Sequence, residues 1–225
     1  MRHNPTVDTL RDRWLADVAG LDVVTDQRAV TALREELLAR WGEPHRSYHD
    51  PVHLAEVLAA LDELAEGGHL AGRDRHLAAL VGWFHDAVYE AGGAPGDSEE
   101  ASARLAEERL PALGLPPADV ATVARLVRES ADHEMSGVDP VSQAFHDADL
   151  WILSAPADRF DGYCAQVRIE YRQVPAADFA RGRSAVLTPF VERERLYLTD
   201  HAHEHWTGRA RVNLRRELDR LARRP

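Results

Sequence analysis

The sequence predicts an all-α fold, organised as a single-domain helical bundle. Leucine, valine and alanine recur at three- and four-residue spacing through most of the 225 residues, and alternating β-branched runs of strand length are absent. No stretch of linker composition divides the chain, and its length is within the reach of one domain. We therefore expect one hydrophobic core within residues 1–225.

Turn-forming clusters divide the first half of the chain into helical segments. Asp50-Pro51 opens the third segment, with proline at its first helical position, and Gly67-Gly68 ends it. The fourth segment contains the apolar run 77–84, which is shorter than the roughly 18 residues of a membrane span and indicates a buried helix. The expected helices span residues 8–18, 26–41, 51–66, 73–89 and 98–110.

The second half shows the same periodicity. Residues 114–117 and Ser136-Gly137 supply glycine and proline breaks. The expected helices there span residues 117–132, 139–153, 157–171, 176–196 and 201–221.

The composition limits the classes of partner. Hydrophobic residues make up 44% of the chain and charged residues 29%, which is typical of a globular protein. Lysine and arginine number 27 against 38 aspartate and glutamate, a net charge of −11 that argues against nucleic-acid binding and against an anionic membrane. A small anionic substrate is still allowed, because a metal ion or an arginine can invert the field inside one cleft. The oligomeric state is left open.

Cysteine content and the first residues indicate the compartment. Cys164 is the only cysteine, so an intramolecular disulfide is impossible. The first residues lack the basic, apolar and small-residue order of a signal peptide, and no apolar run is long enough to span a bilayer. We expect a cytoplasmic protein.

Three motifs carry groups that can bind a metal: Tyr48-His49-Asp50-Pro51-Val52-His53, Trp83-Phe84-His85-Asp86 and Asp147-Ala148-Asp149-Leu150. Each places imidazole or carboxylate groups beside an apolar helical run, and together they offer the nitrogen and oxygen donors that divalent ions prefer. In the first motif, His53 lies in the first turn of a helix and His49 just before it. One histidine can then bind the metal while the other exchanges protons with a reacting group.

The second and third motifs have different geometry. His85 and Asp86 are neighbours, about 100° apart on a helix, so they can bind one ion only from a helix end or across a groove. Burying this pair without a cation is costly. In the third motif, Asp149 precedes Ile152 by three residues and shares its face, which makes Asp149 the expected ligand and Asp147 its supporting residue.

The order His53, His85-Asp86 and Asp149 resembles the His, His-Asp, Asp signature of the HD superfamily of metal-dependent phosphohydrolases. Residues 48–53 also resemble the motif of cyclic-nucleotide phosphodiesterases, in which the first histidine is a proton donor and the second a metal ligand. Residues 84–89, 98–103 and 209–214 are more similar to the small bacterial predicted HD phosphohydrolases. The resemblance implies an HD-type bundle, with a metal-binding core at about 48–153 and helices within 157–221 packed on it.

The resemblance also implies the ligands. It assigns His53, His85, Asp86 and Asp149 to a first divalent ion, with Asp86 able to bridge to a second. The ion would be Mn, Fe, Co, Ni, Zn or Mg, and one or two ions would bind. Further candidates near a second ion or the substrate are His133, its neighbour Glu134, and Asp147. Ser98 stands where the resemblance leads us to expect asparagine before Glu99.

The expected activity is hydrolysis of a phosphate mono- or diester of a small, nucleotide-like molecule by metal-activated water. Asp86 would hold the water, Glu99 could orient it, and His49 would protonate the leaving oxygen. Arg168 and Arg183 could supply cations for the phosphate.

Other interpretations of these residues, and other functions, are left open by the sequence. Solvated helix faces account equally well for the arginines, and the helix dipole for Glu99. His201, His203 and His205 alternate along a helix and so diverge, which indicates surface histidines. A di-iron oxygenase of the HD type and a non-catalytic metal- or nucleotide-binding protein are the alternative functions.

Overall fold

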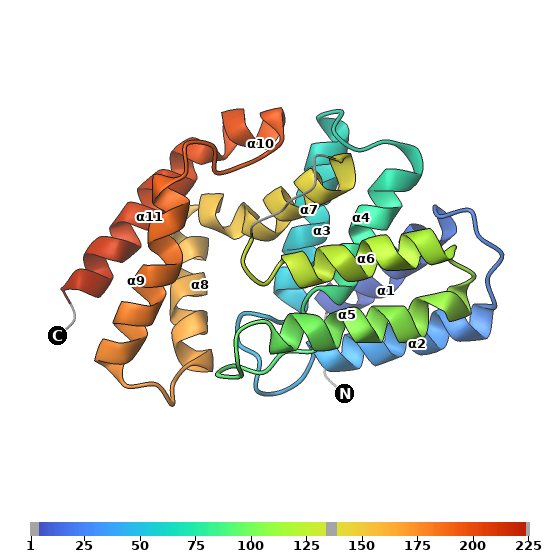
Figure 1. Ribbon diagram of the computed structural model, residues 1–225, viewed down its shortest axis with the longest axis horizontal. Coiled ribbons are helices and arrows are strands. Elements are labelled where there is room, and N and C mark those ends of the chain that lie inside the picture. Colours follow the sequence, from blue (N-terminus) through green and yellow to red (C-terminus); the bar gives the residue numbers. More distant parts are fainter. Residues whose placement is uncertain (1–4, 134–138, 224–225) are drawn as a thin grey trace.

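The computed structural model describes residues 5–133 and 139–223, and every regular element in these ranges is a helix (Figure 1). This confirms the expected all-α class. The α-helices are α1 (Pro5–Ala19), α2 (Gln27–Trp41), α3 (Pro51–Glu66), α4 (Gly72–Phe84), α5 (Asp97–Arg109), α6 (Pro117–Glu129), α7 (Pro140–Asp149), α8 (Ala157–Glu170), α9 (Ala176–Glu192), α10 (Asp200–His205) and α11 (Thr207–Ala222). Two short 3-10 helices, η1 (Leu110–Leu113) and η2 (Leu150–Ser154), complete the list.

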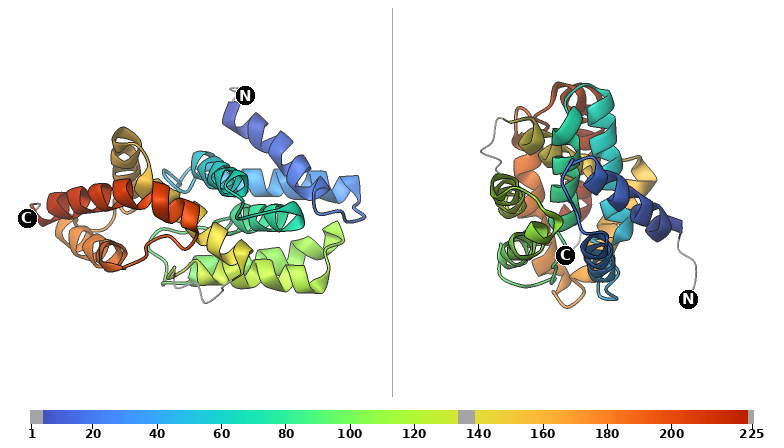
Figure 2. Two further views of the ribbon diagram at one scale, coloured as in Figure 1. Left: turned by 90° about the horizontal axis from the view of Figure 1, so that it is seen from above. Right: turned by 90° about the vertical axis from the view of Figure 1, so that its right-hand side faces the viewer.

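The helices form two neighbouring groups that share one core. Figure 1 shows α1 to α6 on one side and α8, α9 and α11 on the other, with α7 between them, and Figure 2 shows the same division from above. A contiguous set of buried apolar side chains runs through both groups. The chain therefore forms a single helical bundle, as expected.

Three tryptophans organise the centre of the larger group. Trp14, Trp41 and Trp83 are fully buried. The Trp41 indole donates to the Trp83 carbonyl at 3.0 Å, and the Trp83 indole donates to Asp17 at 3.0 Å. These hydrogen bonds satisfy the polar edges of large apolar rings, so α1 and α2 pack tightly around the end of α4.

The start of α3 matches the sequence expectation. Asp50 is its N-cap and accepts hydrogen bonds from the backbone N–H groups of Val52 and His53, while Pro51 occupies the first helical position. This cap fixes the first turn and with it the direction of the His53 side chain.

The fourth helix is shorter than expected. It ends at Phe84, whereas the periodicity predicted a helix to Tyr89. The buried side chain of Arg46 explains the end of the helix, because it donates hydrogen bonds to the carbonyl oxygens of Asp86 and Ala87 at 2.7 and 3.1 Å. Those carbonyls have their partners outside a helix, and His85 and Asp86 lie at and just beyond the helix end.

Later boundaries also differ from the prediction, beginning with the segment expected as 117–132, which ends at Glu129. The segment expected as 139–153 is an α-helix only to Asp149 and continues as η2. The segment expected as 176–196 ends at Glu192, and the segment 201–221 is divided into α10 and α11 at Trp206. In the segment 139–153 tertiary contacts hold the tighter turn, since Tyr197 donates to the Leu150 carbonyl and Asn213 donates to the Leu153 carbonyl. No helix of the described residues is both long and apolar enough to cross a membrane.

Candidate metal centre

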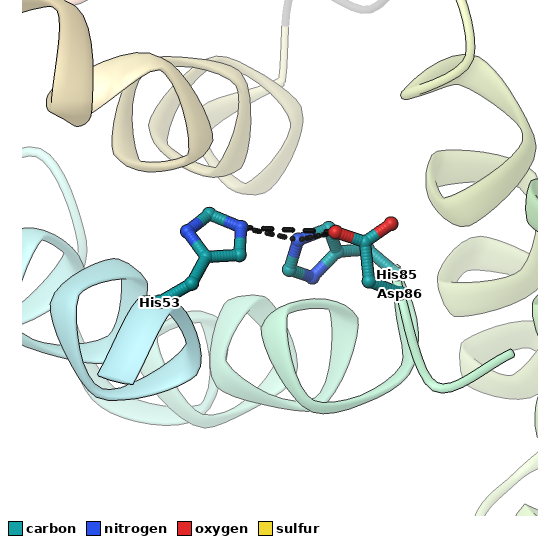
Figure 3. Close-up of side chains that lie close together, drawn as sticks. All are labelled: His53, His85 and Asp86. Carbon is teal, nitrogen blue, oxygen red and sulfur yellow. Dashed lines mark hydrogen bonds and ion pairs between the residues drawn. The ribbon is translucent and has the colours of Figure 1, made fainter. Parts of the chain in front are cut away.

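Four side chains from three helices point at one buried space. His53 lies in the first turn of α3, His85 caps the C-terminus of α4 with Asp86 beside it, and Asp149 is the last residue of α7. Figure 3 shows His53, His85 and Asp86 converging. Because α3, α4 and α7 pack against one another, their ends bring together residues that are distant in the sequence.

The distances among the donor atoms are short. The Nε2 atoms of His53 and His85 are 3.2 Å apart, and Asp86 Oδ2 lies 3.7 Å from the former and 3.2 Å from the latter. Asp149 Oδ1 lies 3.4 Å from each of the two Nε2 atoms. Bonds of about 2.0–2.2 Å to one ion place neighbouring ligand atoms roughly 3.0–3.6 Å apart. His53, His85 and Asp86 could therefore hold a divalent cation with little movement, and Asp149 lies close enough to both histidines to join them.

The orientation of His85 suits this role. Its Nδ1 faces the carbonyl oxygen of Gly82 at 2.8 Å and donates a hydrogen bond to it. That hydrogen bond places the proton on Nδ1 and leaves the lone pair of Nε2 directed at the cluster. His53, His85, Asp86 and Asp149 thus offer two nitrogen and two oxygen donors, a set that suits Mn, Fe, Co, Ni or Zn.

The electrostatics of the cluster favour a positive charge. Burial raises the pKa of the Asp86 and Asp149 carboxyls, but the neighbouring histidines, His85 foremost, together outweigh this and hold both below their ordinary range. Burial lowers the pKa of His85, but the charges of Asp86 and Asp149 raise it well above its ordinary value. Protons or a metal ion can supply the charge that these carboxylates attract.

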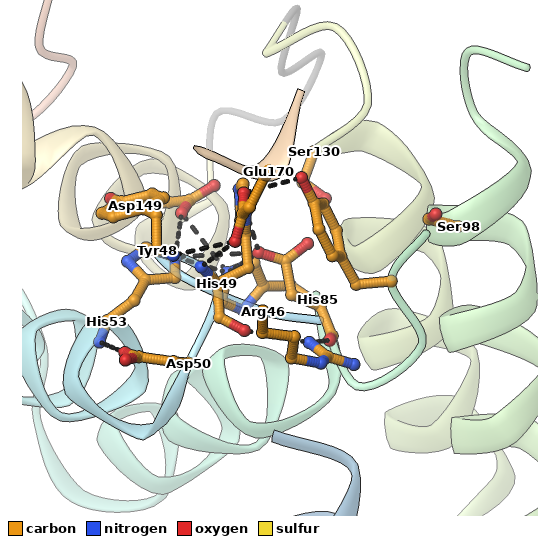
Figure 4. Close-up of polar contacts among 12 residues, drawn as sticks. Arg46, Tyr48, His49, Asp50, His53, His85, Ser98, Ser130, Asp149 and Glu170 are labelled. Carbon is orange, nitrogen blue, oxygen red and sulfur yellow. Dashed lines mark hydrogen bonds and ion pairs between the residues drawn. The ribbon is translucent and has the colours of Figure 1, made fainter. Parts of the chain in front are cut away.

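His49 lies beside the cluster and is held by a residue that the sequence analysis did not assign to the site. His49 Nδ1 lies 2.7 Å from Glu170 Oε2, and its Nε2 lies 4.0 Å from Asp86 Oδ2 (Figure 4). The His49 ring also stacks on Tyr89, with centroids 4.1 Å apart. One nitrogen of His49 is therefore anchored, while the other is directed toward the cluster.

The Glu170 carboxylate accepts hydrogen bonds from several residues near the cluster. Its Oε1 accepts from the backbone N–H groups of Ser47, Tyr48 and His49 at 2.7 to 3.1 Å, and its Oε2 accepts from the Tyr89 hydroxyl at 2.9 Å. The side chain is fully buried. Although burial raises the pKa of Glu170, hydrogen bonds from His49 and the backbone lower it to about 2. The carboxylate is therefore ionised and stabilises a proton on His49 Nδ1.

One sequence signal could have identified Glu170. It is the last residue of α8, where the helix dipole disfavours a negative charge. An acidic residue at that position needs donors from elsewhere in the protein, and the loop before α3 supplies them.

A cavity of about 540 Å³ opens from the metal centre. His49 and Glu99 line it near the cluster, as does His133, whose Nδ1 lies 3.8 Å from Asp149 Oδ2. Burial raises the pKa of Glu99 and lowers that of His133. Both residues are placed where they could serve a second ion or a bound water, and Glu134 lies outside the described residues.

Two of the predicted residues lie away from the cavity. Asp147 accepts hydrogen bonds from the backbone N–H groups of Leu198 and Thr199, so it secures the segment that leads into α10. Arg168 donates to the carbonyls of Tyr171 and Val174 and so secures the turn between α8 and α9. The structure does not bring either residue to the cluster.

The remaining candidate residues lie in three different places. Arg183 lines the cavity on the side of α9. Ser98 accepts a hydrogen bond from the backbone N–H of Glu90 at 3.2 Å and holds the loop before α5. His201, His203 and His205 lie on α10, away from the metal centre.

Comparisons with the models of known families, with curated proteins and with solved structures find no match for this chain.

Proposed function

We propose that the protein is a metal-dependent phosphohydrolase of the HD type that cleaves a phosphate mono- or diester of a small molecule. The observation that carries the proposal is the close approach of two buried imidazole nitrogens, 3.2 Å apart, to two carboxylates at the end of a cavity. Two imidazole nitrogens at this distance need a positive charge between them, which a proton or a divalent cation supplies. The HD-like order of His53, His85-Asp86 and Asp149 assigns that cation to catalysis.

A divalent ion held by His53, His85, Asp86 and Asp149 would bind phosphate oxygens and lower the pKa of water. Asp86 lies between the cluster and His49, since its Oδ2 is 3.2 Å from His85 Nε2 and 4.0 Å from His49 Nε2. It is therefore placed to accept a hydrogen bond from the attacking water and to orient it. Glu99, on the same cavity wall, is placed to take up the proton that the water loses.

His49 acts as the proton donor in this proposal. The ionised Glu170 holds the proton on Nδ1 and turns Nε2 toward the cluster, so that a proton carried on Nε2 would be available to the leaving oxygen. After transfer, the neutral ring keeps its orientation because Glu170 and Tyr89 still hold it. Glu170 is thus a positioning residue that acts through His49.

The test combines metal content with hydrolysis. Elemental analysis of the purified protein is paired with release of phosphate or alcohol from phosphomonoesters and phosphodiesters in the presence of Mn, Fe, Co, Ni, Zn or Mg. We expect tightly bound metal and metal-dependent hydrolysis. Two tightly held irons without hydrolysis would favour the HD-type oxygenase instead. A protein that binds none of these ions would overturn the proposal.

A further inference from the structure

The cavity continues far beyond the metal centre along one face of α9. Phe179, Val186, Leu187 and Phe190 line it, and Val186, Leu187 and Phe190 follow Phe179 by seven, eight and eleven residues, which places all four on a single helical face. Phe190 marks the end near the metal, since its ring centroid is 5.7 Å from that of His133. From Phe190 to Phe179 the helix rises by about 16 Å. A bound phosphate group alone would leave most of this length unfilled.

The far part of the cavity is mainly apolar on the facing sides as well. Val167 of α8 and Ile152 and Leu153 of η2 lie in the wall. Val186 keeps 54% of its surface exposed although it lines the cavity. An apolar group that covered these side chains would remove their surface from water, which is the main source of affinity in such pockets.

The wall is recessed at Gly182, which lies between Phe179 and Val186 on the same face of α9. A Cβ atom added at Gly182 would meet no atom within 4 Å. The absence of a side chain at this position therefore leaves room for a ligand rather than for another part of the protein. A flat ring has room in this recess, because the two flanking side chains lie two turns apart along α9.

Arg183 lies next to this recess and has donors available. It donates a hydrogen bond to the hydroxyl of Tyr163, with its Cζ 4.9 Å from the centre of that ring. Within the described part of the chain, no carboxylate or backbone carbonyl accepts a hydrogen bond from Arg183, whereas Arg168 is bound to two carbonyls and Arg181 to Asp178. A guanidinium has five N–H donors, so Arg183 can bind an oxygen of a ligand in a bidentate manner.

Arg183 and the metal centre belong to one continuous surface. The Tyr163 ring lies 4.5 Å from the Tyr48 ring, and the Tyr48 ring lies 4.6 Å from that of His53. Along α9, Arg183 is about 10 Å from Phe190. A single elongated ligand can therefore reach both the metal and the guanidinium.

On the premise that the protein is a phosphohydrolase, we propose that its substrate is a phosphate ester of a flat, apolar alcohol. This alcohol carries an anionic or carbonyl oxygen at the end remote from the phosphate, and Arg183 binds that oxygen. Gly182 admits the flat group, and Arg183 selects the oxygen at its far end. Both residues determine specificity, and neither takes part in the chemical step.

The test uses esters of primary alcohols, whose leaving groups have similar intrinsic reactivity: ethyl, benzyl, 4-carbamoylbenzyl and 4-carboxybenzyl phosphate. We expect kcat/KM to rise at least tenfold from ethyl to benzyl phosphate. A further rise of at least tenfold is expected for the carbamoyl or the carboxy compound. Of these two compounds, the one with the higher kcat/KM shows whether Arg183 binds a carbonyl or an anionic oxygen.

Two variants test whether Arg183 and Gly182 cause these substrate preferences. In Arg183→Met, the preference for the substituted over the plain benzyl ester should fall at least tenfold, and in the matched variant Arg181→Met it should be unchanged. In Gly182→Leu, the preference for benzyl over ethyl phosphate should fall at least tenfold, and Gly182→Ala should show a smaller fall. Thermal melting of each variant checks that it folds.

Measurements of ligand affinity test the substrate pocket independently of the proposed hydrolase activity. Titration calorimetry of the Mn-loaded protein with ethylphosphonate, benzylphosphonate and 4-carboxybenzylphosphonate requires no turnover. The same order of affinities without hydrolysis of any ester would support the pocket and overturn the hydrolase. Hydrolysis with equal kcat/KM for ethyl and benzyl phosphate, unaltered in Gly182→Leu and Arg183→Met, would support the hydrolase and overturn the pocket.

Discussion

The two ends of α3 each carry a cluster of histidines, and the clusters differ in what their nitrogens face. At the N-terminal end, the Nε2 atoms of His53 and His85 face each other and two carboxylates. At the C-terminal end, Glu63, His69, His201 and His205 form what we call the α10 histidine cluster. There His201 Nε2 is bound to Glu63 at 2.9 Å, and His69 Nε2 accepts from the backbone N–H of His201 at 3.1 Å.

The difference teaches that a group of histidines is a candidate metal site only when their lone pairs converge. In the α10 histidine cluster, ring nitrogens of His69 and His201 already have protein partners, and Glu63 also accepts from the Trp206 indole. At the metal centre, the partner of His85 is on Nδ1, which leaves Nε2 for a cation. A hydrogen bond to the ring nitrogen that faces away from a cluster orients the histidine as a ligand. A hydrogen bond to the nitrogen that faces into the cluster occupies the lone pair that a metal would need.

The largest expected effect comes from removing a carboxylate of the metal centre. Asp86→Ala should lose bound metal and all detectable phosphate release, because the proposed function makes Asp86 both a ligand and the group that orients water. Elemental analysis and a phosphate assay measure the two losses. Asp12→Ala is the matched control, since Asp12 is exposed on α1 and does not line the cavity. Full metal content in Asp86→Ala would contradict its assignment as a ligand.

The next effect separates proton transfer from metal binding. His49→Ala should keep its metal while turnover falls about 10²- to 10⁴-fold, the usual contribution of a general acid. Steady-state kinetics and metal analysis of the same sample provide the measurement. His45→Ala, at a nearby exposed histidine bound to the Tyr89 carbonyl, should have wild-type turnover. Normal turnover in His49→Ala would remove its role as proton donor.

A smaller effect, on stability and its pH dependence, should follow from Glu170→Gln. The pKa of Glu170 is lowered from 4.5 to about 2, so its ionised form stabilises the fold above pH 4.5 and this contribution is lost as the pH falls toward 2. We expect the variant to lose about 3 kcal/mol of unfolding free energy at pH 7. Urea unfolding should show that the gap between wild type and variant narrows below pH 4.5.

The last residue of α9 provides a matched control for Glu170. Glu192 also ends a helix but is exposed, and Glu192→Gln should change the unfolding free energy by less than about 0.5 kcal/mol. Glu170→Gln should also lower kcat and shift the pH profile of kcat, because His49 would lose its ionised partner. A gap in stability that is constant from pH 7 to pH 3 would contradict the role of the Glu170 charge.

The smallest effect is expected at the α10 histidine cluster. Glu63→Gln should leave metal content and turnover unchanged and lower the unfolding free energy by about 1 kcal/mol, the usual contribution of a hydrogen bond. Chemical denaturation and metal analysis of the variant measure both. Loss of bound metal in Glu63→Gln would mean that the α10 histidine cluster, rather than the metal centre, binds the ion.

Much of the fold was predictable because its signals are local. Apolar spacing predicted the helical class, and Asp50-Pro51 predicted the start of α3, since a cap and a proline act within one turn. The end of α4 was predicted wrongly. Its termination depends on Arg46, which lies 40 residues from the carbonyl of Asp86 that it binds. Helical periodicity carries no information on such a partner.

The sequence by itself determined the helical class and identified the chemical groups that meet at the candidate metal centre. Only the tertiary structure decided how they are oriented. It directed Asp149 to the cluster and Asp147 to Thr199, it left donors of Arg183 free in the cavity and bound Arg168 to carbonyls, and it placed Glu170 behind His49. The physical reason is that helix formation depends on neighbours along the chain, whereas the direction of a lone pair or a donor depends on side chains brought together from distant helices.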